Sequence, residues 1–173
     1  MRGLLVTCAL LFSTGAHAAW EYELVEDPMS DAKRGISSLS DQTGKAMIVI
    51  KCDRNGTNSL YMSMISSEYL GGAVSRDRYR TIDYRFDDGP VQSLNAVYDG
   101  RVASVLSFAP KTRESDFLKA FERSGKVAIR VTSYDYKSYT YVFNLAGSLG
   151  AVEKSARACG DTNWYQAPVG QGD

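Results

Sequence analysis

The chain has 173 residues, with 20 lysines and arginines against 20 aspartates and glutamates, so its formal net charge is zero. The charges are scattered, which leaves no basic field for nucleic acid and no polybasic stretch for anionic lipid. The composition therefore excludes a nucleic-acid-binding protein and predicts no stable membrane insertion. The chain is long enough for one domain with a hydrophobic core.

The first 18 residues have the pattern of a cleaved signal peptide. Arg2 gives a positive start, an apolar run over 4–12 follows, and Ala16-His17-Ala18 resembles a cleavage site. The run is too short to anchor the chain in a bilayer, so we expect a periplasmic protein that begins at Ala19. Because His17 is the sequence's one histidine, cleavage removes the commonest general base and the usual zinc ligand.

The cysteine count also follows from cleavage. Cys8 leaves with the signal peptide, so Cys52 and Cys159 remain. Two cysteines in an oxidising compartment predict one disulfide. Closing a loop of about 100 residues contributes up to roughly 4–5 kcal/mol in the chain-entropy model. The alternative is two separate buried thiols.

Along the mature chain, apolar residues mostly recur at every second position, which is typical of β-strands. Two stretches instead have apolar residues at helical spacing and end at glycine or at the second cysteine. We expect strands over 20–25, 36–39, 45–52, 60–64, 79–87, 91–98, 101–108, 126–134 and 138–145, and helices over 112–124 and 149–158.

Short strands at this spacing predict a mainly β fold. We expect an antiparallel β-sandwich, or a barrel-like sheet, with one or two short helices and one disulfide. The sequence shows no internal repeat and no linker, which indicates a single β-rich domain over 19–160. The tail at 161–173 is rich in glycine and polar residues, and we expect it to be flexible.

The best candidate for a binding surface is a tyrosine-rich hairpin. Its first strand carries Tyr134 and Tyr136, and its second carries Tyr139 and Tyr141. Tyrosine combines a broad apolar ring with a polar tip, which suits both protein interfaces and sugar stacking. The alternative is that these rings pack across strands or fill the core.

A second candidate is Arg85, which lies on the outward face of its strand between Asp83 and Asp87. A cross-strand ion pair is the simplest interpretation. If a partner covers that face, Arg85 becomes an anchor, because its planar fork pairs bidentately with carboxylates.

No catalytic, metal or cofactor site is expected. Serines are plentiful, but the mature chain offers no base in a recognisable spacing. The acidic turn at 27–31 supplies two carboxylates, whereas Ca²⁺ takes six or more oxygens. We therefore predict that the protein is not an enzyme and binds no cofactor.

Several segments, taken in order, resemble the type VI secretion-associated family of small exported proteins called VasI- or TagO-like. They are Trp20, Asp27-Pro28-Met29-Ser30-Asp31, Ile48-Val49-Ile50-Lys51-Cys52, Asn55, Leu60-Tyr61-Met62, Tyr84-Arg85-Phe86-Asp87, Phe143-Asn144-Leu145-Ala146-Gly147 and Ala158-Cys159. The resemblance covers nearly the whole mature chain and lies in the order and spacing of these pieces. It implies a periplasmic, non-enzymatic accessory protein with another envelope or secretion-system protein as its partner.

Two other functional classes stay open. A periplasmic inhibitor or immunity protein would neutralise a toxin or a cell-wall hydrolase by plugging its active site with a loop, such as the one over 66–77, or with the tyrosine hairpin. A binder of cell-wall glycan or of a small ligand would use the stacked tyrosine rings.

Overall fold

The computed structural model describes residues 19–26, 28–29, 33–53, 59–72, 78–105, 108 and 112–158. The predicted signal peptide, Cys159 and the predicted tail all lie outside these ranges. The described strands and helices agree closely with the predicted ones. They are β1 (Glu21–Glu26), β2 (Lys33–Ser40), β3 (Ala46–Asp53), β4 (Ser59–Ser66), β5 (Tyr79–Phe86), β6 (Gln92–Asp99), β7 (Val102–Val105), α1 (Arg113–Arg123), β8 (Lys126–Thr132), β9 (Ser138–Asn144) and α2 (Ser148–Ala158).

The nine strands of the described part form one antiparallel sheet in the order β1-β2-β3-β4-β7-β6-β5-β8-β9. The predicted mainly β, antiparallel class with two short helices is confirmed. The expectation of a two-layer sandwich is replaced by a single sheet. The reason is that β7 pairs with β4, with Met62 opposite Val105, and β5 pairs with β8, with Tyr84 opposite Ile129. These two ladders join the hairpins into a continuous sheet.

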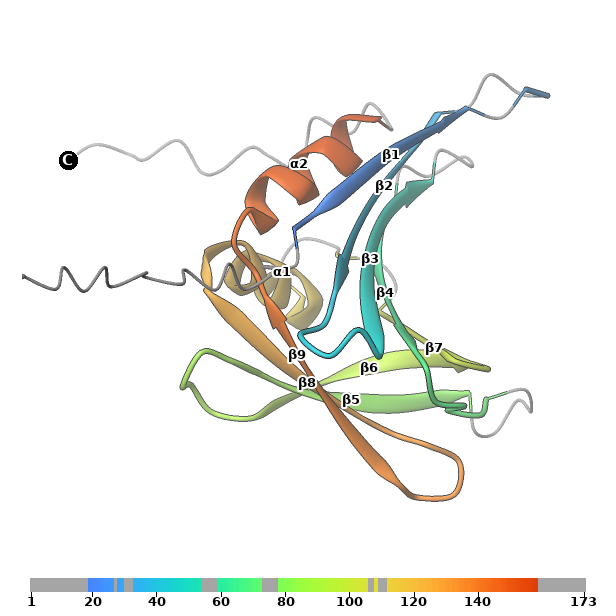
Figure 1. Ribbon diagram of the computed structural model, residues 1–173, viewed down its shortest axis with the longest axis vertical. Helices are drawn as coiled ribbons and strands as arrows, with labels where there is room; N and C mark the ends of the chain where they lie inside the picture. Colours follow the sequence, from blue (N-terminus) through green and yellow to red (C-terminus); the bar gives the residue numbers. More distant parts are fainter. Residues whose placement is uncertain are drawn as a thin grey trace, which may run out of the picture.

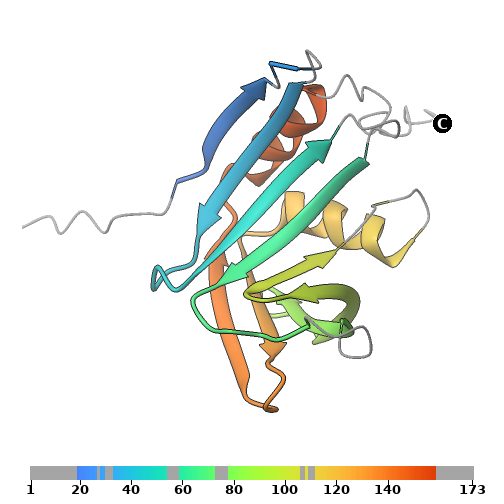
Figure 2. The ribbon, with the colours of Figure 1, turned by 90° about the vertical axis from the view of Figure 1, so that its right-hand side faces the viewer.

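The sheet bends strongly around the two helices (Figures 1 and 2). Its bend brings the far edge back toward the β2–β3 turn, where the Gln42 amide donates to the Val142 carbonyl of β9 at 3.0 Å. Nearby, the Ser66 and Tyr141 hydroxyls lie 2.7 Å apart. These contacts tie β9 to the first half of the sheet.

Alternation along each strand places the apolar side chains on one concave face. The register aligns Ile50 of β3 with Met62 of β4, and Ile129 of β8 with Tyr141 of β9. These four side chains are buried and belong to one continuous core. The sheet therefore has one apolar face, which the helices cover, and one largely polar convex face.

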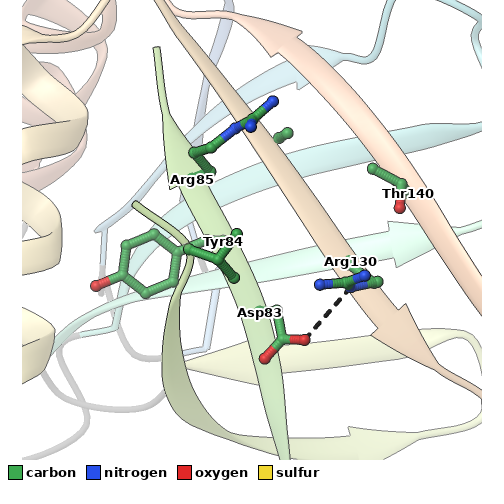
Figure 3. A pocket seen from close by; sticks show the side chains of 7 residues that line it. Asp83, Tyr84, Arg85, Arg130 and Thr140 are labelled. Carbon is green, nitrogen blue, oxygen red and sulfur yellow. Dashed lines mark ion pairs between the residues drawn. The ribbon is translucent and has the colours of Figure 1, made fainter. Parts of the chain in front are cut away.

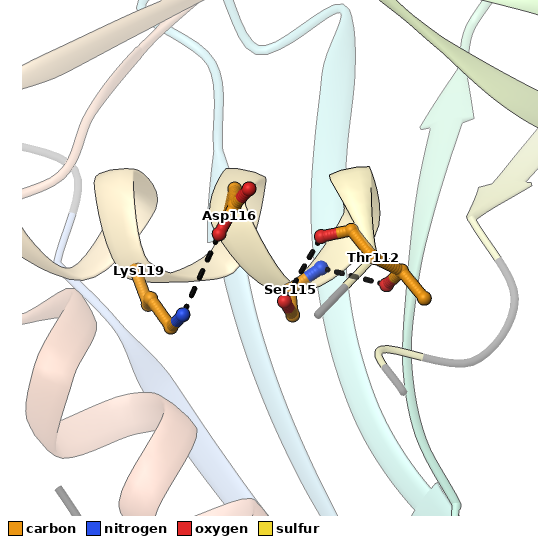
Figure 4. A network of polar contacts seen from close by, with 4 residues as sticks. All are labelled: Thr112, Ser115, Asp116 and Lys119. Atoms are coloured by element: carbon orange, nitrogen blue, oxygen red, sulfur yellow. Dashed lines mark hydrogen bonds and ion pairs between the residues drawn. The ribbon is translucent and has the colours of Figure 1, made fainter. Parts of the chain in front are cut away.

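Helix α1 begins with a side-chain cap and packs through an aromatic cluster. Thr112 Oγ1 accepts a hydrogen bond from the Ser115 amide at 3.2 Å, and the Ser115 hydroxyl returns one to the Thr112 carbonyl at 2.9 Å (Figure 4). Inward, the Phe117 ring lies 4.8 Å from Tyr84 and 5.2 Å from Phe86. Helix α1 thus covers the end of β5.

Helix α2 covers the other half of the concave face. Its buried residues include Ala151 and Ser155, and it packs mainly on β2 and β3. The approach is close at Gly35 of β2, where a Cβ atom would lie 2.7 Å from Ala158 Cβ and 2.9 Å from the Ser155 backbone. Glycine is therefore required here by the contact, because any side chain would push the helix away.

Candidate functional site

The turn between β8 and β9 is held by its own hydrogen bonds. The Ser133 amide donates to the Lys137 carbonyl at 2.8 Å, and the Tyr136 amide donates to the Ser133 carbonyl at 3.1 Å. Asp135 accepts from the Ser133 hydroxyl and pairs with the Lys137 ammonium at 2.8 Å. The hydrogen bonds from Lys137 and Ser133 lower the pKa of Asp135 to about 2, so this carboxylate stays ionised at neutral pH.

Tyr136 has an unusual backbone for its residue type. Its φ is +62° and its side chain is 90% exposed. A side chain other than glycine in the left-handed region costs about 1–2 kcal/mol. The turn therefore holds a large aromatic ring in water at a position where glycine or asparagine is favoured.

Two further exposed tyrosines lie beside one another at the same end of the molecule. The rings of Tyr134 and Tyr69 meet edge to face with centroids 5.6 Å apart, and they are 60% and 51% exposed. Gly71 makes this contact possible, since its φ is +87° and a Cβ there would lie 2.6 Å from Tyr134 Cβ. We call Tyr69, Tyr134 and Tyr136 the tyrosine surface; the β8–β9 hairpin that carries two of them projects from the body of the sheet (Figures 1 and 2).

Arg80 positions the two segments that build the tyrosine surface. One terminal nitrogen donates to the Thr132 carbonyl at 2.6 Å and the other to the Leu70 carbonyl at 2.7 Å. The guanidinium also lies over the Tyr98 ring, 3.8 Å from its centroid. This cation–π interaction stabilises the positive charge of Arg80. Arg80 thereby joins the start of the hairpin turn to the loop that carries Tyr69.

Arg80 and Tyr69 were not predicted from the sequence. A signal for Arg80 was present, because it occupies an inward position of the alternation that continues through Ile82 and Tyr84. A charged residue in such a position has to find partners inside the protein. Tyr69 lies in a loop without periodicity, and nothing in the sequence pairs it with Tyr134.

The other two predicted tyrosines face the core. Tyr141 is 6% exposed and its hydroxyl contacts that of Ser66 at 2.7 Å. Tyr139 is partly buried and packs against the core. The core-packing alternative therefore describes Tyr139 and Tyr141, whereas Tyr134 and Tyr136 lie in solvent. Two of the hairpin's four tyrosines therefore pack against the core, and the other two are exposed.

Arg85 lies on the convex face beside a shallow hollow of about 210 Å³, far from the tyrosine surface. The cross-strand ion pair expected there is made by another arginine: Arg130 Nε lies 3.3 Å from Asp83 Oδ2 (Figure 3). Tyr84 points to the opposite side of β5 (Figure 3). Arg85 lies six strand positions after Tyr79, which is at the tyrosine end, and this spans roughly 20 Å. The structure therefore does not unite the predicted candidates in one site.

A larger cleft, of about 500 Å³, lies between α1 and the β5–β6 hairpin. In it the Tyr84 hydroxyl donates to Gln92 Oε1 at 2.9 Å. Burial raises the pKa of Tyr84, so its hydroxyl stays protonated and serves as a hydrogen-bond donor. Arg113 and Asp116 line the same cleft from α1.

Cys52 is fully buried at the end of β3. It lies opposite Gly35 in the β2–β3 ladder, and Gly35 is the residue on which Ala158 packs. Ala158, which precedes Cys159, therefore lies beside Gly35, the cross-strand neighbour of Cys52. Since Cys159 itself falls outside the described residues, the disulfide stays a prediction.

Other functional groups are sparse in the part of the chain that the structure describes. Among these residues, no cluster of three or more histidine, cysteine, aspartate or glutamate side chains is placed to hold a metal ion. Within the same ranges, no helix is both long and apolar enough to cross a membrane.

Comparisons with known proteins do not establish a family. No family model matches the sequence, and no curated protein matches it. A solved structure with a similar shape is that of invasion associated protein B from Bartonella henselae, at 9% identity and a TM-score of 0.47. The alignment covers 82% of this chain and 94% of that one.

Proposed function

We propose that this chain is a non-enzymatic recognition protein, exported to the periplasm, that binds another envelope protein through the tyrosine surface. The observation that carries the proposal is the conformation of Tyr136. A strained backbone that displays a 90% exposed aromatic ring has no value for folding, because glycine would relieve the strain. Such strain is typical of positions kept for binding.

The remainder of the surface supports the same function. Tyr134 and Tyr69 lie in edge contact, and the turn is fixed by the Asp135–Lys137 pair. Rings that are already ordered lose little conformational entropy when they enter a protein interface. Tyrosines of this kind, together with arginine and tryptophan, are the usual hot spots of protein interfaces.

The wider role in this proposal comes from the sequence. The resemblance to the VasI- or TagO-like family supports an accessory protein of a type VI secretion system or a similar envelope assembly. The signal-peptide pattern supports export. The closeness of Ala158 to the neighbour of Cys52 supports the disulfide that would keep such a domain rigid outside the cytoplasm.

The test is a quantitative pull-down of partners from a periplasmic extract of the native host. The informative variant is Tyr136→Gly, which removes the ring and also relieves the left-handed strain, so its fold is retained. A matched control is Tyr22→Ala, which removes a tyrosine that is 42% exposed on β1. We expect one stoichiometric protein partner that is lost with Tyr136→Gly and kept with Tyr22→Ala.

Other outcomes overturn the assignment. A partner that is retained at full yield by Tyr136→Gly and by Tyr134→Ala would exclude the tyrosine surface as the interface. Capture of a secreted toxin or wall hydrolase, with inhibition of its activity, would favour the inhibitor class instead. Binding of wall fragments that quenches tyrosine fluorescence in the wild type but not in Tyr136→Gly would favour the glycan class.

A further inference from the structure

The hollow on the convex face has a simple origin. Arg85 lies opposite Ala128 across the β5–β8 ladder, and Asp83 lies opposite Arg130. Ala128 and Arg130 are two residues apart on one strand, so they share the convex face. Since Ala128 offers only a methyl group, the longer side chains around it leave a depression, which Tyr84, Val91 and Thr140 also line.

The charges around the hollow are unbalanced. Asp83 is fully engaged, because Oδ2 pairs with Arg130 Nε and Oδ1 accepts from the Ser93 hydroxyl at 2.7 Å. Two further carboxylates near the end of β5 also have partners. Asp87 accepts from the Gly125 and Lys126 amides, and Asp88 pairs with the Lys126 ammonium at 3.3 Å.

Arg85 is thus the one cation on this part of the convex face that has no carboxylate partner among the described residues. Arg130 contacts Asp83 through Nε, at 3.3 Å. Both arginines line the same hollow and are exposed. Two guanidinium groups therefore flank a depression that contains a single carboxylate.

We propose that this hollow binds a carboxylate side chain from an acidic segment of a partner protein, held between Arg85 and Arg130. Charge complementarity identifies the occupant, because an aspartate or glutamate supplies the missing negative charge and accepts both N–H groups of a guanidinium fork. Val91, which is 56% exposed, offers apolar contact to the rest of that segment. Thr140 places a hydroxyl at the opposite rim.

This site is independent of the tyrosine surface, which lies at the other end of β5. A negative result for this hollow would therefore leave the proposed role of the tyrosine surface intact. A negative result for the tyrosine surface would likewise leave the hollow untested by that experiment. A partner that used both sites would have to extend along the strands for roughly 20 Å.

The experiment is an NMR titration that follows the arginine Nε–Hε signals of the full domain. The probe is a short capped peptide in which leucine flanks two adjacent glutamates, and its control has glutamine in place of each glutamate. We expect saturable shifts at Arg85 and Arg130 with the glutamate peptide and none with the glutamine peptide. The exposed Arg101, in the β6–β7 turn, is the control: its signal reports non-specific electrostatic attraction of the glutamate peptide to an arginine.

Variants of Arg85 make the result specific. In Arg85→Gln, binding of the glutamate peptide, followed at Arg130, should weaken roughly fivefold. Arg85→Lys keeps the charge without the guanidinium fork, so its affinity should lie between those of the wild type and Arg85→Gln. Equal concentration dependence at Arg101 and Arg85 would overturn the proposal, since the attraction would then be non-specific. Tighter saturation by inorganic phosphate than by the peptide would also overturn it, because the site would then favour a free anion.

Discussion

Ser155 of α2 donates a hydrogen bond to Ser37 of β2 at 2.8 Å, and Ser37 donates in turn to the Ala151 carbonyl at 2.9 Å. Both serines are 0% exposed. This short chain of hydrogen bonds crosses the boundary between helix and sheet, where the surrounding contacts are apolar. It fixes the position of α2 along β2, because a shift of the helix would leave two buried hydroxyls without partners.

Replacement of Ser155 by alanine should lower the free energy of unfolding by about 1–3 kcal/mol, since Ser37 loses its donor inside the protein. The measurement is chemical denaturation at neutral pH. Ser40→Ala, at an exposed position of the same strand β2, should change the stability by less than about 0.5 kcal/mol. Equal stability of the two variants would show that the buried contact contributes nothing.

The contact at Gly35 predicts opposite effects for two glycine-to-alanine substitutions. Gly35→Ala places a methyl group 2.7 Å from Ala158 Cβ, so it should destabilise the protein by about 1–3 kcal/mol through displacement of α2. Gly150→Ala lies within α2 with nothing within 4 Å of the added Cβ, so it should stabilise by about 0.5–1 kcal/mol. Thermal unfolding of the pair tests both signs, and stabilisation by Gly35→Ala would contradict the helix position.

The predicted bridge between Cys52 and Cys159 makes a simple thiol-counting prediction. The protein, purified under oxidising conditions and denatured without reductant, should show no reactive thiol at either cysteine. Reduction should then lower its stability by about 2–4 kcal/mol. The readout is labelling with a thiol reagent followed by mass measurement. Two labelled cysteines in the oxidised protein would favour the alternative of separate buried thiols.

Asp41 should contribute to the acid sensitivity of the fold. It is 4% exposed; burial raises its pKa, but hydrogen bonds from the Thr43 side chain and from the Ala46, Thr43 and Lys45 backbone outweigh this, so the pKa is lowered overall. A lowered pKa in the folded state means that the unfolded chain binds the proton first as the pH falls. The stabilisation by Asp41 is therefore complete at neutral pH and is lost below about pH 4.

Asp41→Asn should lower the stability at pH 7 by about 1–3 kcal/mol and flatten the loss of stability below about pH 4. Urea denaturation over a pH series measures both effects. Asp99→Asn, at an exposed position of β6, serves as the control and should leave the profile unchanged. An unaltered acid profile in Asp41→Asn would show that other carboxylates are responsible.

The local structure was predictable because alternation reports directly on which side chains share a face. Arg85 was expected on the outward face of its strand, and the burial along β5 agrees, because Ile82 and Tyr84 are buried whereas Arg85 is exposed. The single sheet was not predictable. It depends on β4 pairing with β7 and on β5 pairing with β8, and periodicity within a strand carries no information about its distant neighbours.

The candidate site was predictable only in part for a related reason. The sequence places four tyrosines in one hairpin. It does not say which of them face the core, because that depends on which side of the hairpin packs against the rest of the protein. Tyr69 joins the surface through a contact with Tyr134, 65 positions later in the chain by their numbering. That contact depends on a guanidinium, Arg80, whose partners come from three separate segments.

The position of α2 also sets the order in which this protein can fold. Ser37 and Ala151 are 114 residues apart, so the strands made first keep half of their apolar face uncovered until the last helix has been synthesised. Contacts this distant in sequence form slowly. A nascent chain consequently cannot close the core over β2 until α2 has been synthesised.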